Sequence, residues 1–395
     1  MKFEDYKQIV RGKRNNITLV LKVTNDCPLR CTYCYHFYKN KEDMSLEMPI
    51  ELLKESIVKM CLPFKEVNIH VHGGEPLSLP NEKLEEIFKF ISEYRDAVKD
   101  YQKVFPAVQT NLCFYDDEKK KLIEKYQIGL STSFDGIYHD KTRNLDVEEG
   151  INKLNGIKEK GIINVVTKDM LGKFDEQMET FEKIKNSTVM SNAVFPYCCP
   201  SESRLHPGDY ADYVIKRFEY QFNNNKDFSW DTLRYFNAVV YDGKGLDCFC
   251  SYCLNSIYTI NPSGVIQGCD VRHEDIYYYG NIRDIEKYED IFELEGYQKF
   301  EKATYEVINR CSNCEAFKYC RGGCFNRVVV DEETNCIARD AYCYDIKKLI
   351  AYYKEFFAKY DNDINKLPER LRHTRIMLDK ECKDKQDFYS KGENK

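Results

Sequence analysis

The sequence predicts an α/β fold, in which a parallel sheet curls into a partial or complete barrel and a smaller cysteine-rich domain follows. The first observation is the alternation of short β-rich runs with amphipathic helical stretches between residues 18 and 195, which is typical of repeated β–α units. The second is a jump in cysteine density, since 10 of the 18 cysteines lie between Cys248 and Cys343. At 395 residues the chain is long enough for one large domain or two ordinary ones.

Six β-rich runs alternate with five helical stretches in the first half of the chain. The strands are expected at Thr18–Val23, Glu66–His72, Val104–Thr110, Gly129–Ser133, Asn164–Thr167 and Val189–Phe195. The helices are expected at Ser45–Met60, Glu82–Val98, Asp116–Tyr126, Val147–Lys160 and Phe174–Lys185. Catalytic groups in such folds lie at the carboxyl ends of the strands and in the loops that follow, so we expect the functional residues there.

The second half divides by composition. Residues 201–246 are polar and aromatic and predict a connector with one or two helices between a first domain, residues 1–200, and a cysteine-rich domain, residues 247–345. Within the latter, the run SIYTINPSGVIQGCD predicts a β-hairpin that turns at Asn261–Gly264. Residues 346–395 are expected to form a C-terminal helix and a tail with a frayed, charged end.

The charge balance and hydropathy exclude two classes of function. Lys and Arg number 59 and Asp and Glu 65, and the formal net charge of −6 is spread along the chain, which argues against nucleic-acid binding by bulk electrostatics. No run approaches the roughly 20 apolar residues of a membrane helix, and the N-terminus lacks the apolar core of a secretory signal. The expectation is a soluble, cytoplasmic protein with neither nucleic acid nor membrane as a partner.

Eighteen cysteines are unusual for such a chain, because the cytoplasm keeps thiols reduced and does not favour disulfides. Most of them are therefore expected to be metal ligands. Three stand alone without ligand spacing and are expected to be buried small hydrophobic residues: Cys61, Cys113 and Cys382.

A first cysteine cluster follows the first predicted strand. The run NDCPLRCTYCY places Cys27, Cys31 and Cys34 in C-x3-C-x2-C spacing. A structural zinc site takes four ligands, whereas a [4Fe–4S] cluster held by three cysteines keeps one iron open for another ligand. The spacing favours the cluster; the alternative is a zinc knuckle completed by His36 or a remote residue.

This cluster resembles the signature of the radical S-adenosylmethionine (SAM) enzymes, C-x3-C-x-aromatic-C, with Tyr33 at the aromatic position. The resemblance implies a partial (β/α)6 barrel in which the open iron binds the amino and carboxylate groups of SAM. It also implies cleavage of SAM to a 5′-deoxyadenosyl radical that abstracts a hydrogen atom from the substrate. The cofactors then carry the chemistry, while the protein positions them and excludes water.

Further motifs of that family match after the second, third and fourth predicted strands. HGGEP resembles the GGE motif that receives the SAM ammonium, QTN ends the third strand as in related peptide-modifying members, and STSFDGIYHDKTR resembles a segment with a ribose-contacting S-x-D and a carboxylate-binding arginine. The cofactor-binding residues so implied are Tyr33, Gly73, Gly74, Glu75, Gln109, Asn111, Ser133, Asp135 and Arg143. The alternatives are a common turn at the glycine pair and a solvated surface charge at Arg143.

A second cysteine cluster resembles the SPASM extension of radical SAM enzymes. CSNCEAFKYCRGGC has C-x2-C-x5-C-x3-C spacing, and the flanking intervals complete that extension's seven-cysteine pattern. The resemblance implies two auxiliary [4Fe–4S] clusters, hence three in all. One set is Cys248, Cys253, Cys269 and Cys324, with Cys250 competing for the place of Cys248, and the other is Cys311, Cys314, Cys320 and Cys343. The alternative is a pair of zinc ribbons.

The roles of three further cysteines are left open. Cys198 and Cys199 follow the sixth predicted strand, where they line a substrate pocket or simply pack, and Cys336 has no assigned role.

SPASM-type enzymes mostly modify peptides or proteins. The resemblance therefore implies oxidation of a side chain in a ribosomally made polypeptide, with an electron donor such as flavodoxin or ferredoxin. The leading interpretation is peptide maturation that forms a thioether or another cross-link. The alternative is conversion of a sulfatase cysteine or serine to formylglycine. It is suggested by Asp270, which follows Cys269 as the proposed general base does in sulfatase maturases, although an aspartate that caps a turn explains it equally well.

Two non-catalytic alternatives are a zinc-stabilised scaffold and an Fe–S electron carrier, neither of which needs the GGEP and SFDG motifs after successive strands. Many peptide maturases carry a leader-binding domain before the barrel. Because only 26 residues precede Cys27, any leader recognition is expected to use another surface.

Overall fold

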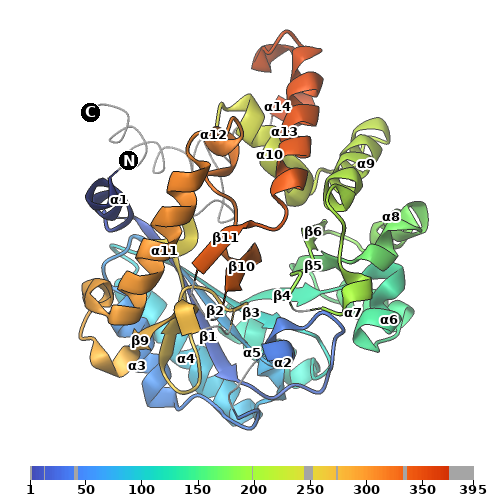
Figure 1. Ribbon diagram of the computed structural model, residues 1–395. Helices are drawn as coiled ribbons and strands as arrows, with labels where there is room; N and C mark the ends of the chain where they lie inside the picture. The colour runs from blue at the N-terminus through green and yellow to red at the C-terminus, as the bar shows by residue number, and fades with distance from the viewer. Residues whose placement is uncertain are drawn as a thin grey trace. The chain divides into compact units, whose positions relative to one another are not determined.

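The first two hundred residues form the expected succession of strands and helices (Figure 1). The structure is a computed structural model that describes residues 2–12, 14–39, 43–197, 199–243, 252–272, 275–331 and 336–372. The strands are β1 (Asn16–Thr24), β2 (Glu66–Gly73), β3 (Lys103–Thr110), β4 (Gly129–Ser133), β5 (Gly161–Val166) and β6 (Val189–Ala193). The helices are α2 (Tyr35–Lys39), α3 (Ile50–Cys61), α4 (Asn81–Val98), α5 (Asp117–Lys125), α6 (His139–Arg143), α7 (Val147–Asn155) and α8 (Phe174–Glu182). All six expected strands and all five expected helices are confirmed.

Capping residues account for several helix boundaries. Helix α5 begins after Asp116, whose carboxylate accepts hydrogen bonds from the backbone N–H groups of the first turn, and α7 begins in the same way after Asp146. Helix α3 begins later than the Ser45 expected from the sequence. Its first turn follows Pro49, while Ser45 is held in a turn by two hydrogen bonds to Asp43.

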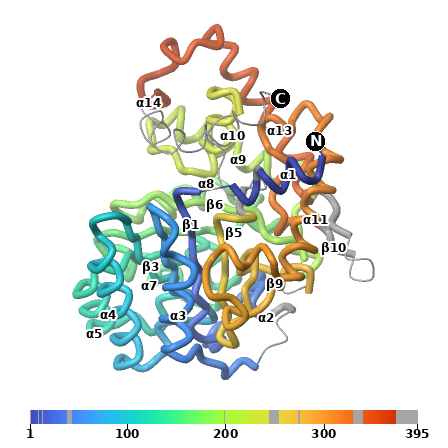
Figure 2. Tube along the Cα trace, turned by 90° about the vertical axis from the view of Figure 1, so that its left-hand side faces the viewer, coloured from blue at the N-terminus to red at the C-terminus, as the bar shows by residue number. Residues whose placement is uncertain are grey.

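Strands β1 to β6 form a parallel sheet in the order β6-β5-β4-β3-β2-β1. Its two faces differ: in β2 the buried Val67, Ile69 and Val71 alternate with partly exposed polar residues. Helices α3 and α4 contact β1 and β3 and cover the apolar face (Figure 2). Because Lys22 is in register with His72, these two side chains share the polar face.

The predicted hairpin is confirmed, and it extends this sheet. Strand β7 (Ile257–Ile260) pairs parallel to β1, and β8 (Val265–Gln267) and β9 (Tyr278–Asn281) follow as antiparallel neighbours. The Asn261 carboxamide oxygen accepts hydrogen bonds from the N–H groups of Ser263 and Val265, and Gly264 takes a φ of +90°. The pairing with β1 places the residues after β8 beside the barrel strands.

The described structure divides into two compact units. The barrel unit comprises Arg14–Arg204 and Leu254–Phe300, and so includes the hairpin. The cysteine-rich unit comprises Met1–Lys13, Leu205–Cys253 and Glu301–Lys395. The segment boundaries at residues 200, 246 and 345 stay predictions.

Aromatic helix packing forms the core of the cysteine-rich unit. Its elements are α1 (Phe3–Val10), α9 (Asp209–Asn223), α10 (Trp230–Val240), most of α11 (Glu295–Cys311), α12 (Phe317–Cys320), β10 (Val328–Asp331), β11 (Cys336–Asp340), α13 (Cys343–Ala358) and α14 (Glu369–Arg372). The Phe218 ring meets those of Tyr353 and Phe356 edge to face, at centroid distances of 5.2 and 5.1 Å. Along the described residues, no helix has the length and apolar character needed to cross a membrane.

Candidate active site at the carboxyl edge of the barrel sheet

The loop after β1 carries the first cysteine cluster. Cys27 is buried, Cys31 and Cys34 are partly exposed, and all three are free thiols. The Cys34 N–H donates to the Cys31 carbonyl at 3.0 Å, and the Arg30 guanidinium donates to the Cys27 carbonyl at 2.8 Å. Since the Thr32 N–H donates to the carbonyl of Thr142 at 3.0 Å, the loop is also tied to the segment after β4.

The donor set of this loop fits an iron–sulfur cluster. Burial raises the pKa of Cys27 to about 12 and that of Cys31 to about 11, so the protein by itself does not stabilise thiolates there. A positively charged metal centre would supply that stabilisation. The alternative ligand His36 is otherwise engaged, because its Nε2 lies 3.0 Å from the Asn25 carbonyl oxygen. Over the described ranges, no three His, Cys, Asp or Glu side chains lie close enough together to bind a single metal ion. A [4Fe–4S] cluster is larger than one ion, so its ligands lie farther apart.

The glycine pair after β2 permits a close backbone approach to this loop. Gly73 has a φ of +138°, and a Cβ on Gly74 would lie 2.1 Å from the Asp26 carbonyl oxygen. The Gly74 N–H donates to Thr24 and the Glu75 N–H to Asp26, each at 2.7 Å. Glycine is thus required where the end of β2 meets the start of the cysteine loop.

Glu75 is buried and held by three donors. One carboxylate oxygen accepts from the Leu77 N–H at 2.9 Å and the Thr110 hydroxyl at 2.7 Å, and the other accepts from the Asn111 N–H at 2.6 Å. Burial raises the pKa of Glu75, against the opposing effect of these hydrogen bonds. The carboxylate is therefore fixed between the ends of β2 and β3.

The polar residues after β3 and β4 reach toward the same edge. The Asn111 amide nitrogen lies 3.5 Å from the Cys27 sulfur, and the Gln109 amide nitrogen lies 3.4 Å from the Ser133 hydroxyl. The structure thus brings Asn111 next to the cysteine loop and Gln109 next to Ser133.

Asp135, expected from the resemblance to contact the ribose of SAM, is enclosed by hydrogen-bond donors of the protein itself. Its side chain is fully buried, and one carboxylate oxygen accepts from the Tyr33 hydroxyl, from the Thr142 hydroxyl at 2.7 Å and from the Arg143 Nε at 3.1 Å. The same Nε lies 2.9 Å from the Tyr33 hydroxyl. Arg143 is 8% exposed, so a solvated surface charge is excluded for it.

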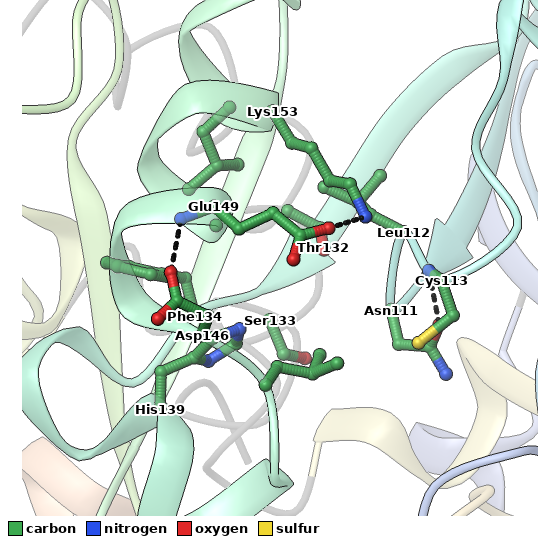
Figure 3. Close-up of a pocket in the computed structure, with 13 residues that line it drawn as sticks. Asn111, Leu112, Cys113, Thr132, Ser133, Phe134, His139, Asp146, Glu149 and Lys153 are labelled. Carbon is green, nitrogen blue, oxygen red and sulfur yellow. Dashed lines mark hydrogen bonds and ion pairs between the residues drawn. The ribbon is translucent and has the colours of Figure 1, made fainter.

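A pocket lies beside these residues, between the ends of β3 and β4 and helix α7 (Figure 3). Its lining includes Asn111, Ser133 and the Cys113 thiol, with the Lys153–Glu149 ion pair at 2.8 Å on its α7 wall. Cys113 is only partly buried, whereas Cys61 is fully buried as expected.

Asp270, directly after Cys269, faces the polar side of the sheet. Its carboxylate accepts a hydrogen bond from the Tyr35 hydroxyl at 2.5 Å and lies 3.7 Å from the His72 Nε2, while its carbonyl accepts from Lys22 at 2.9 Å. Burial opposes ionisation, but His72, Lys22 and the Tyr35 hydrogen bond outweigh it and lower the pKa of Asp270. The carboxylate is therefore ionised and able to accept a proton.

The tautomer of His72 follows from its neighbours. The Gly73 N–H donates to its Nδ1 at 2.8 Å, so the ring hydrogen is on Nε2 and points to Asp270. Tyr35, His72 and Lys22 were not predicted from the sequence. The signal available for His72 was its position beside the glycine pair at the end of a strand, and Tyr35 directly follows the last cysteine of the loop.

In the cysteine-rich unit, four predicted cluster ligands line one pocket. These are Cys311, Cys314, Cys320 and Cys343, the complete second auxiliary set. Apolar side chains and glycines supply much of the remaining wall, among them Phe317 and Ile346. Cys324 is not part of this lining; it is buried, and its N–H donates to Asp340 at 2.8 Å.

The other auxiliary set is described only in part. Cys269 belongs to the barrel unit and Cys324 to the cysteine-rich unit, Cys253 lies in a 3-10 turn at residues 252–255, and Cys248 and its competitor Cys250 lie outside the described residues. Of the remaining cysteines, Cys199 is buried, Cys336 begins β11, and Cys198 and Cys382 lie outside the described residues.

Comparisons with known proteins agree with this geometry. Residues 21–187 match the family model of the Radical SAM superfamily. A cysteine-type anaerobic sulfatase-maturating enzyme of Clostridium novyi (strain NT) is 26% identical over 329 residues, covering 78% of this chain and 87% of that protein. Another, from Clostridium perfringens (strain 13 / Type A), is 24% identical over 365 residues, covering 86% and 94%.

Solved structures share the fold. Native anSMEcpe with bound AdoMet and Kp18Cys peptide superposes with a TM-score of 0.70 at 21% identity, covering 87% of this chain and 98% of that chain. Streptococcus suis SuiB bound to precursor peptide SuiA superposes with a TM-score of 0.59 at 16% identity, covering 86% and 79%. Residues 21–187 of this chain thus match the Radical SAM superfamily, and the chain is similar over most of its length to anaerobic sulfatase-maturating enzymes.

Proposed function

We propose that this enzyme oxidises a side chain of a ribosomally made peptide. The observation that carries the proposal is the convergence of three free cysteines, the buried Glu75 and the ionised Asp270 around the carboxyl edge of one sheet. SAM bound with a [4Fe–4S] cluster would supply a 5′-deoxyadenosyl radical that removes a hydrogen atom from the substrate carbon. Cys27, Cys31 and Cys34 would hold that cluster.

Different residues of the chain would bind different parts of SAM. Gly73, Gly74 and Glu75 lie against the cysteine loop and would receive the ammonium group through carbonyl and carboxylate oxygens. The Arg143 guanidinium, packed at Tyr33, would receive the carboxylate. The partly exposed Gln109, Asn111 and Ser133 remain for the polar groups of the nucleoside.

Asp270 would act as the general base. After the substrate carbon loses a hydrogen atom, formation of a double bond there needs the loss of one electron and one proton. The ionised carboxylate is placed to accept the proton, and Tyr35 and His72 orient it. The electron would pass to an auxiliary cluster.

Two products are compatible with this chemistry. A cross-link such as a thioether joins the oxidised carbon to a second group of the peptide, and a precursor peptide is bound by SuiB, whose fold this chain shares. Formylglycine formation from cysteine or serine is the second candidate. It is favoured by Asp270 and by the similarity to cysteine-type anaerobic sulfatase-maturating enzymes over most of the chain.

We further propose three [4Fe–4S] clusters in the complete enzyme. The shared pocket of Cys311, Cys314, Cys320 and Cys343 supports the second auxiliary cluster, and Cys248, Cys253, Cys269 and Cys324 remain the proposed ligands of the first. A flavodoxin or ferredoxin is the proposed electron donor, and a cytoplasmic location follows from the cysteine content.

The test uses anaerobically reconstituted full-length protein, reduced and supplied with SAM. Release of 5′-deoxyadenosine is expected, and its absence from protein with full cluster iron would contradict the proposal. Candidate peptides are then added: precursor peptides encoded near this gene, and cysteine or serine peptides from a sulfatase active-site segment. A cross-link appears as the loss of two hydrogens without an aldehyde, whereas formylglycine reacts with a hydrazide probe.

A further inference from the structure

The buried Asp135 is the centre of a hydrogen-bond group that joins three segments of the barrel unit. One oxygen of its carboxylate accepts from the Asn164 amide at 3.3 Å and the Val165 N–H at 3.1 Å, both on β5. The other oxygen accepts from Tyr33, Thr142 and Arg143, as described above. A carboxylate offers about four lone-pair sites as hydrogen-bond acceptors, and five donors occupy those of Asp135. With 0% exposure, Asp135 has no acceptor left for a ligand.

Arg143 is held by one end of its guanidinium only. Its Nε lies 2.9 Å from the Tyr33 hydroxyl and 3.1 Å from an Asp135 carboxylate oxygen. Within the described part of the chain, no protein group accepts a hydrogen bond from either Nη nitrogen. Four N–H donors in a planar fork thus remain, the arrangement that grips a carboxylate in a bidentate manner.

We propose that Asp135 is a positioning residue, which fixes Arg143 so that its two Nη groups face the carboxylate of SAM. The inference rests on the proposed function, since it takes SAM as the ligand. Tyr33 belongs to the cysteine loop and shares the Arg143 Nε with Asp135, so the same group also fixes the distance between the cysteine loop and the arginine. Contact with the ribose, expected of Asp135 from the sequence, falls to Ser133 and Gln109, which are partly exposed.

The physical advantage is preorganisation. A free arginine side chain loses several rotamers when it binds, whereas a side chain already held at Nε loses few, and the difference appears in ligand affinity. Loss of a hydrogen bond to a charged group typically weakens binding roughly tenfold to a hundredfold.

The test is SAM affinity of the reconstituted full-length enzyme, measured by calorimetry and by the change that SAM causes in the electron paramagnetic resonance spectrum of the reduced cluster. Asp135→Asn should bind SAM roughly ten to a hundred times more weakly with unchanged cluster iron. Asp140→Asn is the matched control, because Asp140 is an exposed aspartate of the same segment, and its affinity should equal that of the wild type.

Two comparisons separate positioning from ribose contact. In a double-mutant cycle, Asp135→Asn should add little to Arg143→Ala if it acts through Arg143, and additive losses would overturn the proposal. A SAM analogue that lacks one ribose hydroxyl should lose the same factor in the wild type and in Asp135→Asn. If Asp135→Asn no longer discriminates against the analogue, Asp135 contacts the ribose and the proposal fails.

A milder variant covers the case in which Asp135→Asn loses its fold or its iron. Thr142→Val removes one donor to Asp135 and leaves Arg143 in place; it should weaken SAM binding several-fold, and unchanged affinity would refute the positioning role. If the iron-loaded wild type itself does not bind SAM, the proposed function fails instead.

Discussion

The two cysteine sites of this chain have different surroundings. In the barrel unit, three thiols share a loop with polar neighbours, including the Asn111 amide and the Arg143 guanidinium. In the cysteine-rich unit, four thiols line a pocket walled largely by apolar side chains and glycines. Three ligands with polar neighbours leave room for a polar cofactor, whereas four ligands in an apolar wall complete a cluster by themselves. Under the proposed function, ligand number and neighbouring polarity would distinguish a site for binding and cleavage of a cofactor from one for electron transfer.

The units also differ in their histidines. His36, His70, His72 and His139 all belong to the barrel unit, and burial lowers the pKa of each. Among the described residues of the cysteine-rich unit, the histidine is His206, which is exposed. Acid should therefore destabilise the barrel unit through these buried histidines.

The largest expected effect comes from removing the barrel-unit ligands. The triple change of Cys27, Cys31 and Cys34 to Ala should abolish 5′-deoxyadenosine production and remove one third of about twelve irons, because each of three cubes holds four. Iron analysis and chromatography of the nucleoside products measure both. The control Cys61→Ala, at a buried cysteine outside both sites, should keep its iron. SAM cleavage by the triple variant would contradict the radical SAM site.

Removing a ligand from the other pocket should give the opposite pattern. Cys314→Ala or Cys320→Ala should lose cluster iron and stop peptide modification while some SAM cleavage persists, since the cleavage site lies elsewhere. Nucleoside and peptide products are quantified in the same reaction, and circular dichroism checks folding, to which structural metal contributes. Normal peptide turnover by an iron-depleted variant would refute the role of this pocket.

Asp270→Asn tests the base within the barrel unit. General-base assistance typically contributes about 10²–10⁴-fold, so product formation should slow by that order while SAM affinity stays the same. Asp284→Asn, at an exposed aspartate of the same unit, should behave as the wild type. A cross-linking enzyme that binds its thiolate at a cluster tolerates the Asp270 change better than an aldehyde-forming one. Wild-type turnover by Asp270→Asn would remove the base assignment.

The smallest expected effect concerns His139 and pH. Burial lowers its pKa from 6.5 to about 4 in the folded protein, so the unfolded chain binds a proton that the folded chain does not between these values. The free energy of unfolding is unaffected by His139 above pH 6.5. It falls as the pH drops toward 4, by about 2 kcal/mol at pH 5, because protonation then favours the unfolded chain. Denaturant unfolding at pH 7.5 and pH 5 measures it.

A substitution isolates the contribution of His139. The difference in stability between the two pH values should shrink in His139→Gln. An equal acid sensitivity in both proteins would show that His139 is already protonated in the fold.

Local patterns were sufficient for the elements of the barrel and for the outline of the site. Strand β4 begins and ends at the predicted residues because a short β-rich run lies between clear helix signals. Cys27, Cys31 and Cys34 are neighbours in the chain, so their spacing alone brings them onto one loop. Gly73 and Gly74 were recognisable as a glycine pair that follows a strand and resembles the GGE motif, and in the structure the close approach of two backbones excludes a Cβ at that point.

Long-range contacts were not predictable in this way. The pairing of β7 with β1 joins residues more than two hundred positions apart, and it places Asp270 against Tyr35 and His72. The sequence does not distinguish Lys22 from any other charged residue of a strand. In the structure it is buried and donates a hydrogen bond to the Asp270 carbonyl. Asp135 matched a motif for ribose contact, but five donors from three segments surround it.

The succession of strands and helices along the chain, the cysteine spacings and the family signature follow from residues close together in the chain, because periodicity and loop spacing are local properties. The partners of Asp135 and Asp270 depend on which distant segments meet when the sheet forms. A carboxylate has the same appearance in the sequence whether it binds a ligand, accepts a proton or anchors an arginine. Only the donors that surround it after folding, and the water that burial removes, decide among these roles.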